Sequence, residues 1–395
     1  MKRRDFLKSS GLASTSLLIP SFLSDFSFNK LFRSRTGKVL VVVQLSGGND
    51  GLNTIVPYQN DIYYKSRPSL AINDSEVLRV SDELGFNPAL ASLRDLYDNG
   101  NLTIINSVGY PNPDRSHFRS MDIWHTASDS DEYLSSGWLG RYLDSNCPHP
   151  YHGLEVSDSL SLAMKGAEKN GFAMSNPNQL RKTAGNRFLQ AVAEHTDHDH
   201  LEENVAYLYK TMIDTQQSAK YLYDQSQVHR SRVEYPRNPF GQDLKQIAEL
   251  ITADTDTKIY YVSLSGFDNH ANQKNQQERL LRAYADGMKA FVTDLKQNGL
   301  LDDVLIMTFS EFGRRVEQNA SNGTDHGTAN NLFLMGGNLQ KPGFYNAAPT
   351  LQTLDEGDLI YEIDFRNIYA TILERWLEAD APKVLGGNFK PIPFV

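Results

Sequence analysis

The chain has 395 residues, of which 40% are hydrophobic and 22% charged, and its formal net charge is -9. This composition is typical of a globular protein with enough apolar material for a sizeable core. The acidic balance, without a long basic stripe, argues against nucleic acid as the natural partner, because phosphate neutralisation needs clustered lysine and arginine. With Cys147 as its single cysteine, the chain can form no internal disulfide.

The N-terminus has the pattern of an export signal. Residues 3–7 read Arg-Arg-Asp-Phe-Leu, and an apolar stretch over 11–23 follows. Serines and Pro20 interrupt this stretch, so it is too short and too weakly apolar to span a bilayer of roughly 30 Å. The pattern predicts a twin-arginine signal peptide and linker over 1–35, cut between 21 and 35. We therefore expect the twin-arginine translocase to export the chain to the periplasm or the cell surface, with no stable membrane span.

Five short apolar runs predict buried strands. Their hydrophobicity is nearly continuous rather than alternating, which is typical of strands covered on both faces in a mostly parallel sheet. Apolar residues recur at helical spacing from Leu281 to Leu295, just before the fourth run, which predicts a crossover helix of a βαβ unit. The runs are residues 39–45, 102–108, 259–264, 304–309 and 331–335.

The order of these elements predicts one α/β domain over 36–395. Its architecture is a three-layer sandwich, with helices on both faces of a mostly parallel central sheet. A polar, helix-periodic stretch over 186–231 contains no strand-like run. This stretch predicts a helical insertion at about 180–235.

Polar loops follow the first four predicted strands, and a fifth loop precedes the last one. In open α/β sheets the ligand crevice lies outside the carboxyl ends of the strands, so we expect these loops to meet there. They contain carboxylates, imidazoles and one hydroxyl. The loops are residues 46–51, 113–117, 265–270, 310–314 and 324–330.

Six loop residues are candidate ligands of a divalent metal ion. Carboxylate oxygen and imidazole nitrogen bind Zn²⁺, Mn²⁺, Mg²⁺ or Ca²⁺, and so many carboxylates in one cleft would repel each other without a cation. Asp50 and Asp268 lie in glycine-rich turns, where an aspartate also suits the role of turn former or helix N-cap, and that alternative stays open. The six candidates are Asp50, Asp268, His270, Glu311, Asp325 and His326.

Ser116 lies at the start of a predicted helix over 116–126, where free N–H groups and the helix dipole favour an anion. Its hydroxyl is a candidate nucleophile toward a phosphate or sulfate ester, or simply an N-cap. Arg115 and Arg314 are candidates to hold substrate oxygens, with surface salt bridges as the alternative. His117 is a candidate catalytic proton donor or ligand, and Asn49 a candidate to orient substrate.

The same segments together resemble the bacterial family catalogued as domain of unknown function 1501. The resemblance covers nearly the whole chain after the signal, and the family is similar in turn to the alkaline phosphatase and sulfatase superfamily of metal-dependent α/β hydrolases. It implies an alkaline phosphatase-like fold. The segments that carry it are QLSGGNDGLNTIVP at 44–57, PDRSHFRSMDIWHTA at 113–127, GWLGRYLD at 137–144, GFDNHANQ at 266–273, TFSEFGRR at 308–315 and DHGTANNLFLMGG at 325–337.

The resemblance also implies roles for individual residues. Asp50 occupies the place of the first-strand metal aspartate and Ser116 that of the nucleophile. The pair Asp268 and His270 resembles one metal subsite, although the superfamily spaces that pair by four residues. Glu311 resembles the acidic ligand of the other subsite and His326 the late histidine ligand, while Phe312 stands where the superfamily usually has histidine.

Two functions of different classes follow. The first is an exported metal-dependent hydrolase acting on a small anionic phosphate or sulfate ester, in which Ser116 attacks, the metal neutralises the developing charge, and Arg115 or Arg314 orients the ester. The second is a non-catalytic periplasmic or surface protein that binds a glycan or a partner chain through the helical insertion.

Overall fold

The computed structural model describes residues 37–194 and 203–395. The signal peptide predicted over 1–35 lies outside the described residues. At the centre is a nine-stranded sheet with the order β11-β5-β10-β9-β1-β8-β6-β7, and β14 also pairs with β5. Its strands are β1 (Val39–Ser46), β5 (Leu102–Gly109), β6 (Gly153–Glu155), β7 (Phe172–Ala173), β8 (Ile259–Ser265), β9 (Val304–Phe309), β10 (Asn330–Met335), β11 (Gly343–Phe344) and β14 (Ile363–Asp364).

The sheet is mostly parallel. Strand β1 pairs in parallel with both β8 and β9, and helix α11 (Gln273–Gln297) connects those two neighbours, as a βαβ crossover requires. Strand β10 runs antiparallel to both β5 and β9. All five predicted strands are present, and the strands that the sequence pattern missed have only two or three residues.

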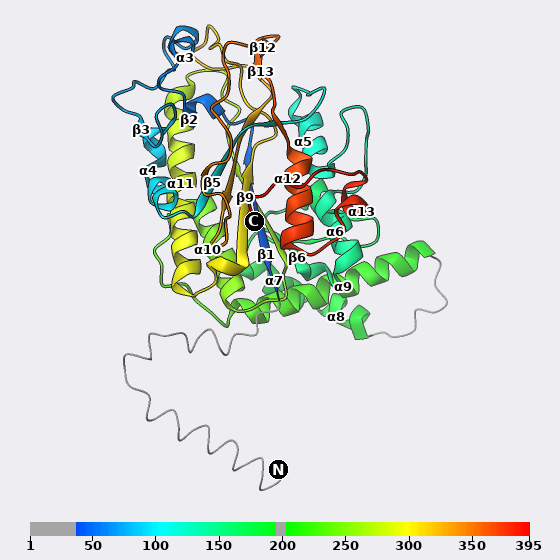
Figure 1. Cartoon of the computed structure of the whole chain (residues 1–395). Coiled ribbons are helices and arrows are strands. Elements are labelled where there is room, and N and C mark those ends of the chain that lie inside the picture. Colours follow the sequence, from blue (N-terminus) through cyan, green and yellow to red (C-terminus); the bar gives the residue numbers. More distant parts are fainter. Residues whose placement is uncertain (1–36, 195–202) are drawn as a thin grey trace. The chain divides into compact units, whose positions relative to one another are not determined.

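Helices cover both faces of the sheet, so the predicted three-layer α/β architecture is confirmed. Alternate residues of β1 enter opposite layers: Val41 and Val43 pack in the cluster that contains α4, α10 and α11, whereas Leu40 and Val42 pack with α5, α6, α12 and α13. Figure 1 shows these two helical groups on opposite sides of the sheet. Their bounds are α4 (Ala91–Asp98), α5 (His117–Thr126), α6 (Trp138–Asn146), α10 (Pro239–Thr252), α12 (Phe365–Thr371) and α13 (Ala381–Leu385).

Three further helices occupy the region predicted as an insertion: α7 (Pro177–Ala184), α8 (Arg187–Glu194) and α9 (Glu203–Ser226). Short elements elsewhere are α3 (Asp61–Ser66), a small sheet of β2 (Ile55–Val56), β3 (Leu78–Arg79) and β4 (Gly85–Phe86), and a hairpin of β12 (Leu354–Asp355) and β13 (Asp358–Leu359). Single 3₁₀ turns span Gly51–Asn53, Pro88–Leu90, Pro150–His152, Leu162–Met164 and Leu301–Asp303, and a π-helical turn spans Ile372–Trp376.

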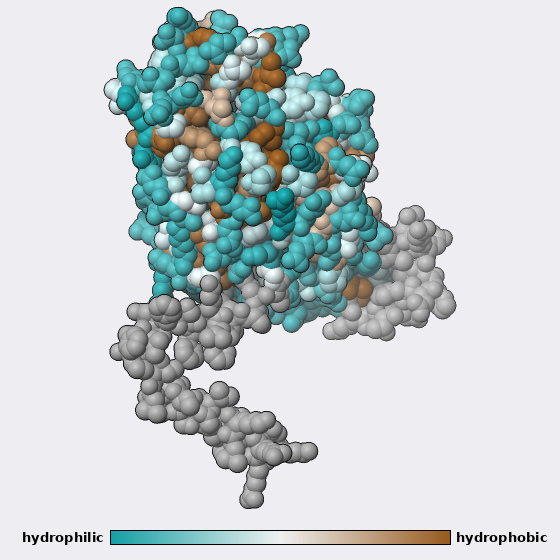
Figure 2. Space-filling view, in the orientation of Figure 1, coloured by the Kyte–Doolittle hydropathy of each residue, from teal (hydrophilic) through white to brown (hydrophobic). Residues whose placement is uncertain are grey.

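The visible face in Figure 2 is largely hydrophilic, with apolar side chains confined to separate patches. Most of the apolar material therefore lies in the two layers beside the sheet. None of the helices in the described residues combines the length and apolarity needed to cross a bilayer.

Candidate metal centre

The ends of three neighbouring strands bring the site together. Ser46 of β1 is level with Ser265 of β8, and Gln44 of β1 is level with Phe309 of β9. The loops that follow these strands therefore start side by side at one edge of the sheet, as the sequence predicted. The N-terminus of α5 and the loop before β10 join them, because Arg314 pairs with His326 in an isolated β-bridge and His117 contacts Glu311.

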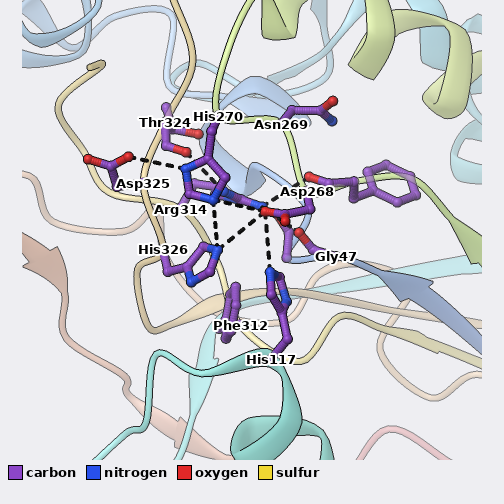
Figure 3. Close-up of polar contacts among 12 residues, drawn as sticks. Gly47, His117, Asp268, Asn269, His270, Phe312, Arg314, Thr324, Asp325 and His326 are labelled. Atoms are coloured by element: carbon purple, nitrogen blue, oxygen red, sulfur yellow. Dashed lines mark hydrogen bonds and ion pairs between the residues drawn. The ribbon is translucent and has the colours of Figure 1, made fainter. Parts of the chain in front are cut away.

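One carboxylate oxygen lies at the centre of this cluster. Asp268 Oδ1 is 3.0 Å from His270 Nε2, 3.2 Å from His117 Nε2 and 3.3 Å from His326 Nε2. Arg314 Nη2 donates to the same oxygen at 2.8 Å. Figure 3 shows the three imidazoles directed at Asp268: His117 comes from the start of α5, and His270 and His326 come from two separate loops. Ligand atoms of His117, Asp268 and His326 all lie within 4.8 Å of one another, close enough to share one metal ion.

The other ring nitrogen of each histidine is held by an acceptor. A carboxylate or a carbonyl oxygen can only accept, so each Nδ1 carries the proton and each Nε2 presents a lone pair in the neutral ring. The same arrangement holds metal-binding histidines in proteins, where an outer acceptor fixes the ring and its tautomer. The three Nδ1 contacts are His117 to Glu311 Oε1 (2.9 Å), His270 to Asp325 Oδ1 (3.2 Å) and His326 to the carbonyl of Arg115 (2.7 Å).

Three lone pairs thus converge on an oxygen that has lone pairs of its own. His270 Nε2 and His326 Nε2 are also only 2.9 Å apart, and His117 Nε2 is buried without a hydrogen-bond partner. Neutral imidazoles cannot satisfy one another in this arrangement, since none of the facing nitrogens carries a hydrogen. A cation where these atoms meet would satisfy all of them, so the residues present fit a metal ion.

The electrostatics of the cluster favour an ionised Asp268. Partial burial opposes ionisation, but the hydrogen bond from Arg314 and the positive charge of its guanidinium outweigh it and hold the pKa of Asp268 well below its usual range. The two imidazoles that face Asp268 shift in opposite directions. The hydrogen bond to Glu311 raises the pKa of His117, whereas burial lowers the pKa of His326, whose Nδ1 meets a neutral carbonyl.

Phe312 supports two of the rings. Its ring centroid lies 4.8 Å from that of His117 and 4.8 Å from that of His326. Figure 3 shows the phenyl ring beside both imidazoles. Phe312 therefore packs against the cluster and limits how two of its rings can turn.

An open cleft of about 410 Å³ reaches the cluster, which forms one of its walls. Phe118, Met121 and Asp122 of α5 form another wall and were not singled out from the sequence. The available signal was that Met121 and Asp122 come three and four positions after Phe118, because residues three and four apart share one face of a helix. The lining is Ser46, Gly47, His117, Phe118, Met121, Asp122, Ser265, Gly266, Asp268 and Glu311.

Ser116 is exposed at the N-cap of α5, and its hydroxyl makes no capping hydrogen bond. Its neighbours on either side both contact the cluster, His117 through its ring and Arg115 through its carbonyl. The Arg115 guanidinium turns away and binds Asp358, 2.7 Å from Nε to Oδ2.

Two residues predicted to act at the site are buried beside it. Asp50 is 3% exposed, and its carboxylate lies 2.6 Å from Arg67 Nη1. Asn49 is also buried and donates from its amide to Thr54. The structure therefore groups Asp268, the three histidines, Glu311 and Asp325, and places Asp50 and Asn49 outside the group.

Arg314 is also buried, and each of its three guanidinium nitrogens donates within the chain. Besides Asp268, it donates to the carbonyls of four residues that bracket the site. It therefore ties the loops together and fixes the central carboxylate. The four carbonyls are those of Gly47, Gly48, Phe267 and Thr324.

Comparison with known proteins identifies the family. The family described as "Protein of unknown function (DUF1501)" matches residues 37–377. The chain belongs to this family. The resemblance inferred from the sequence motifs is thereby confirmed. No curated protein matches the DUF1501 chain.

Several solved structures are similar at low identity. The PsFucS1 sulfatase from Pseudoalteromonas sp. is 12% identical with a TM-score of 0.40, covering 92% of this chain and 72% of that chain. The phosphonate monoester hydrolase SpPMH from Silicibacter pomeroyi is 10% identical with a TM-score of 0.39, covering 90% and 76%. A protein in the alkaline phosphatase superfamily from Vibrio parahaemolyticus is 9% identical with a TM-score of 0.39, covering 90% and 68%.

Proposed function

We propose that this chain is an exported, metal-dependent hydrolase of phosphate or sulfate esters. The observation that carries the proposal is the convergence of three imidazole Nε2 atoms on Asp268 Oδ1, each ring having an acceptor at Nδ1. Such a set of donors is costly to assemble in a folded protein unless a cation joins it. His117, Asp268, His270 and His326 are the proposed ligands.

The donor set favours one group of metals. Imidazole suits zinc and other transition metals, whereas magnesium and calcium prefer oxygen ligands. Three nitrogens and one oxygen therefore point to Zn²⁺ or a similar ion rather than Mg²⁺ or Ca²⁺. When bound, the ion would supply Lewis-acid stabilisation of the charge that develops on the ester oxygens.

Two of the carboxylates first considered as ligands take outer positions in this proposal. Glu311 holds Nδ1 of His117, and Asp325 holds Nδ1 of His270. Glu311 also accepts from the Gly47 amide at 2.8 Å, which ties the first loop to the site. These residues orient the imidazoles and increase their basicity toward a metal.

Ser116 is the proposed nucleophile. It is exposed between two residues that contact the cluster, at the end of α5 where the helix dipole favours an anion. Ser116 Oγ would bond to phosphorus or sulfur as the bond to the leaving oxygen breaks, its proton passing to the departing alcohol. Water would then hydrolyse the ester formed on Ser116.

Export is part of the proposal. The paired arginines at positions 3 and 4 support transport by the twin-arginine translocase, so the chain would act in the periplasm or at the cell surface. That pathway moves folded chains. A site built from distant loops would therefore be complete before export and ready to take its metal in the cytoplasm.

Metal content and turnover test the proposal together. Mature protein purified without chelators should contain about one transition metal per chain by elemental analysis. It should also cleave at least one ester in a panel of chromogenic phosphate and sulfate esters. A metal-free, inert protein would refute the hydrolase and support the alternative, a binding or assembly protein.

Two variants separate the roles. Ser116→Ala should abolish turnover while metal content and thermal unfolding stay unchanged, because the hydroxyl makes no capping bond. Asp268→Ala should lose both the metal and turnover. Ser159→Ala, at an exposed serine after β6, is the matched control. Full turnover in Ser116→Ala would exclude this serine as the nucleophile.

A further inference from the structure

We propose that the cleft selects esters with a single negative charge, namely sulfate monoesters or phosphate diesters, over dianionic phosphate monoesters. This inference rests on the hydrolase proposed above and narrows its substrate class. It follows from the charges that line the cleft and from the charges that are absent there.

The cleft is lined by three carboxylates and no permanent cation. Asp122, Asp268 and Glu311 are in its wall, and none of the described residues that line it is lysine or arginine. The Asp122 carboxylate has no ion pair or hydrogen-bond partner among residues 37–194 and 203–395. Arg314 pairs with Asp268 from behind this wall, and a divalent ion would face Asp268 and Glu311, so Asp122 is the carboxylate of the lining that has no cationic partner. Each further charge on the ester would add repulsion from Asp122.

The nearest guanidinium groups are already occupied. Arg314 is 2% exposed and donates to four carbonyls and to Asp268, so its guanidinium is held inside the protein and does not line the cleft. Arg115 directs its guanidinium to Asp358 of the β12–β13 hairpin, with Glu356 3.5 Å away. Neither side chain lines the cleft, so neither supplies there the clamp of paired hydrogen bonds that would offset the repulsion of a dianionic phosphoryl group.

The positive potential that remains is small. Helix α5 begins at the cleft, and no side chain caps its first turn. The unpaired amides at a helix N-terminus are equivalent to about half a positive charge. This is enough to help place a monoanion beside the metal, but not to balance a dianion.

The other wall is suited to an apolar organic group. Phe118 is 87% exposed, and Met121 lies one turn further along α5 on the same face. An aromatic or alkyl group on the ester would cover both side chains and remove apolar surface from water. The expected substrate is thus a monoanionic ester with an apolar organic part.

Binding of two matched anions tests the charge selection directly. Phenyl sulfate and phenyl phosphate differ by one charge at about pH 8, since the second pKa of a phosphate monoester is roughly 6. Calorimetric titration of the zinc-loaded mature protein should give a Kd for phenyl sulfate that is about fivefold lower than the Kd for phenyl phosphate. Equal or tighter binding of phenyl phosphate, or no binding of either anion, would overturn the inference.

Turnover measurements distinguish sulfate monoesters from phosphate diesters as substrates. They also test the hydrolase activity separately from the charge selection. We expect 4-nitrophenyl sulfate or bis(4-nitrophenyl) phosphate to be cleaved with a higher kcat/KM than 4-nitrophenyl phosphate, and the better of the two identifies the ester type. Turnover that favours 4-nitrophenyl phosphate overturns the charge selection and leaves the hydrolase standing. No turnover of any ester, with the expected Kd ratio intact, refutes the hydrolase and supports the charge selection.

A charge-neutral variant tests the residue responsible. In Asp122→Asn the ratio of the Kd for phenyl phosphate to the Kd for phenyl sulfate should fall about fivefold, so that the two anions bind nearly equally. The reason is that the variant removes one repelling charge from the wall. Asp158→Asn, at an exposed aspartate outside the cleft, makes the same change in net charge and should leave the ratio unaltered. Equal effects of the two variants would show that Asp122 does not determine the selection.

Discussion

Two aspartates a short distance beyond the ends of neighbouring strands have opposite surroundings. Asp50 is buried, and its Oδ2 receives hydrogen bonds from Arg67 at 2.6 Å and Gln273 at 2.5 Å. Asp268 has a side chain that is 49% exposed, and its Oδ1 faces the Nε2 atoms of three imidazoles besides Arg314. Both residue types are ordinary metal ligands, yet only the second lies where further ligand atoms converge.

The comparison shows how the surroundings of a structural carboxylate differ from those of a proposed metal ligand. Around Asp50 each donor has an acceptor within the chain: Arg67 also donates to the carbonyls of Arg315 and Val316, and Gln273 accepts from Thr324. This network is complete and needs no ion. Around Asp268 the outer nitrogens have partners, while the inner ones meet atoms of the same kind.

The largest effect is expected when the complete network is broken. Arg67→Met leaves the Asp50 carboxylate buried without its cation, so the free energy of unfolding should fall by about 3–5 kcal/mol. Denaturant unfolding with a constant m-value is the measurement. The double variant Arg67→Met/Asp50→Asn should recover much of the loss, because no buried charge then remains unpaired.

An exposed ion pair provides the control for that measurement. Arg79 pairs with Asp74 at 2.7 Å, and their side chains are 55% and 44% exposed. Arg79→Met should change the free energy of unfolding by less than about 1 kcal/mol. If Arg67→Met is equally mild, the distinction between the two regions fails.

A third carboxylate shows what burial does without a cation. Glu155 of β6 is buried and accepts from the amide and hydroxyl of Ser161, and burial raises its pKa from 4.5 to about 7. Between these values the folded chain retains a proton that the unfolded chain releases. The free energy of unfolding should therefore fall as pH rises through this window, by up to about 1.4 kcal/mol per pH unit.

Glu155→Gln should remove that decline, since the amide does not titrate. Chemical unfolding of the metal-free protein at several pH values from about 4.5 to 7 measures the slope in each variant. The exposed Glu76→Gln is the control and should retain the wild-type slope. Parallel curves for wild type and Glu155→Gln would refute a raised pKa at this position.

The sequence predicted the layers and the edge of the sheet, because near-continuous apolar runs mark strands buried on both faces. It also identified the loops, since polar residues after buried strands are visible in the chain itself. The strands of two or three residues left no periodic signal. The antiparallel direction of β10 depends on how the chain between β9 and β10 returns to the sheet, which no local sequence pattern predicts.

Among the candidate site residues, sequence could not distinguish Asp50 from Asp268. Both follow strands in glycine-rich turns, and the difference depends on Arg67, which comes seventeen positions after Asp50 and was not singled out. The engagement of Arg314 was equally hidden, because its acceptors are backbone carbonyls of separate loops. Whether a side chain still has donors or acceptors free for a ligand depends on its tertiary contacts, which the sequence does not show.

The final prediction concerns the outer acceptors of the imidazole cluster. Glu311 accepts from His117 Nδ1 at 2.9 Å and is almost fully buried, so its charge acts on the ring with little screening. Glu311→Gln should keep the fold but weaken zinc binding about 10- to 100-fold, as the loss of an outer carboxylate does in metal sites. Competition with a chromogenic chelator measures the affinity.

Two further variants serve as comparisons for the zinc affinity of Glu311→Gln. Asp325→Asn should weaken binding less than Glu311→Gln, because Asp325 is 57% exposed and its contact with His270 is longer, at 3.2 Å. Glu317→Gln, an exposed change of the same kind nearby, should leave the affinity unaltered. If Glu311→Gln removed the metal as completely as Asp268→Ala, Glu311 would be a direct ligand. If it had no effect, the imidazole of His117 would not need its acceptor to bind a metal.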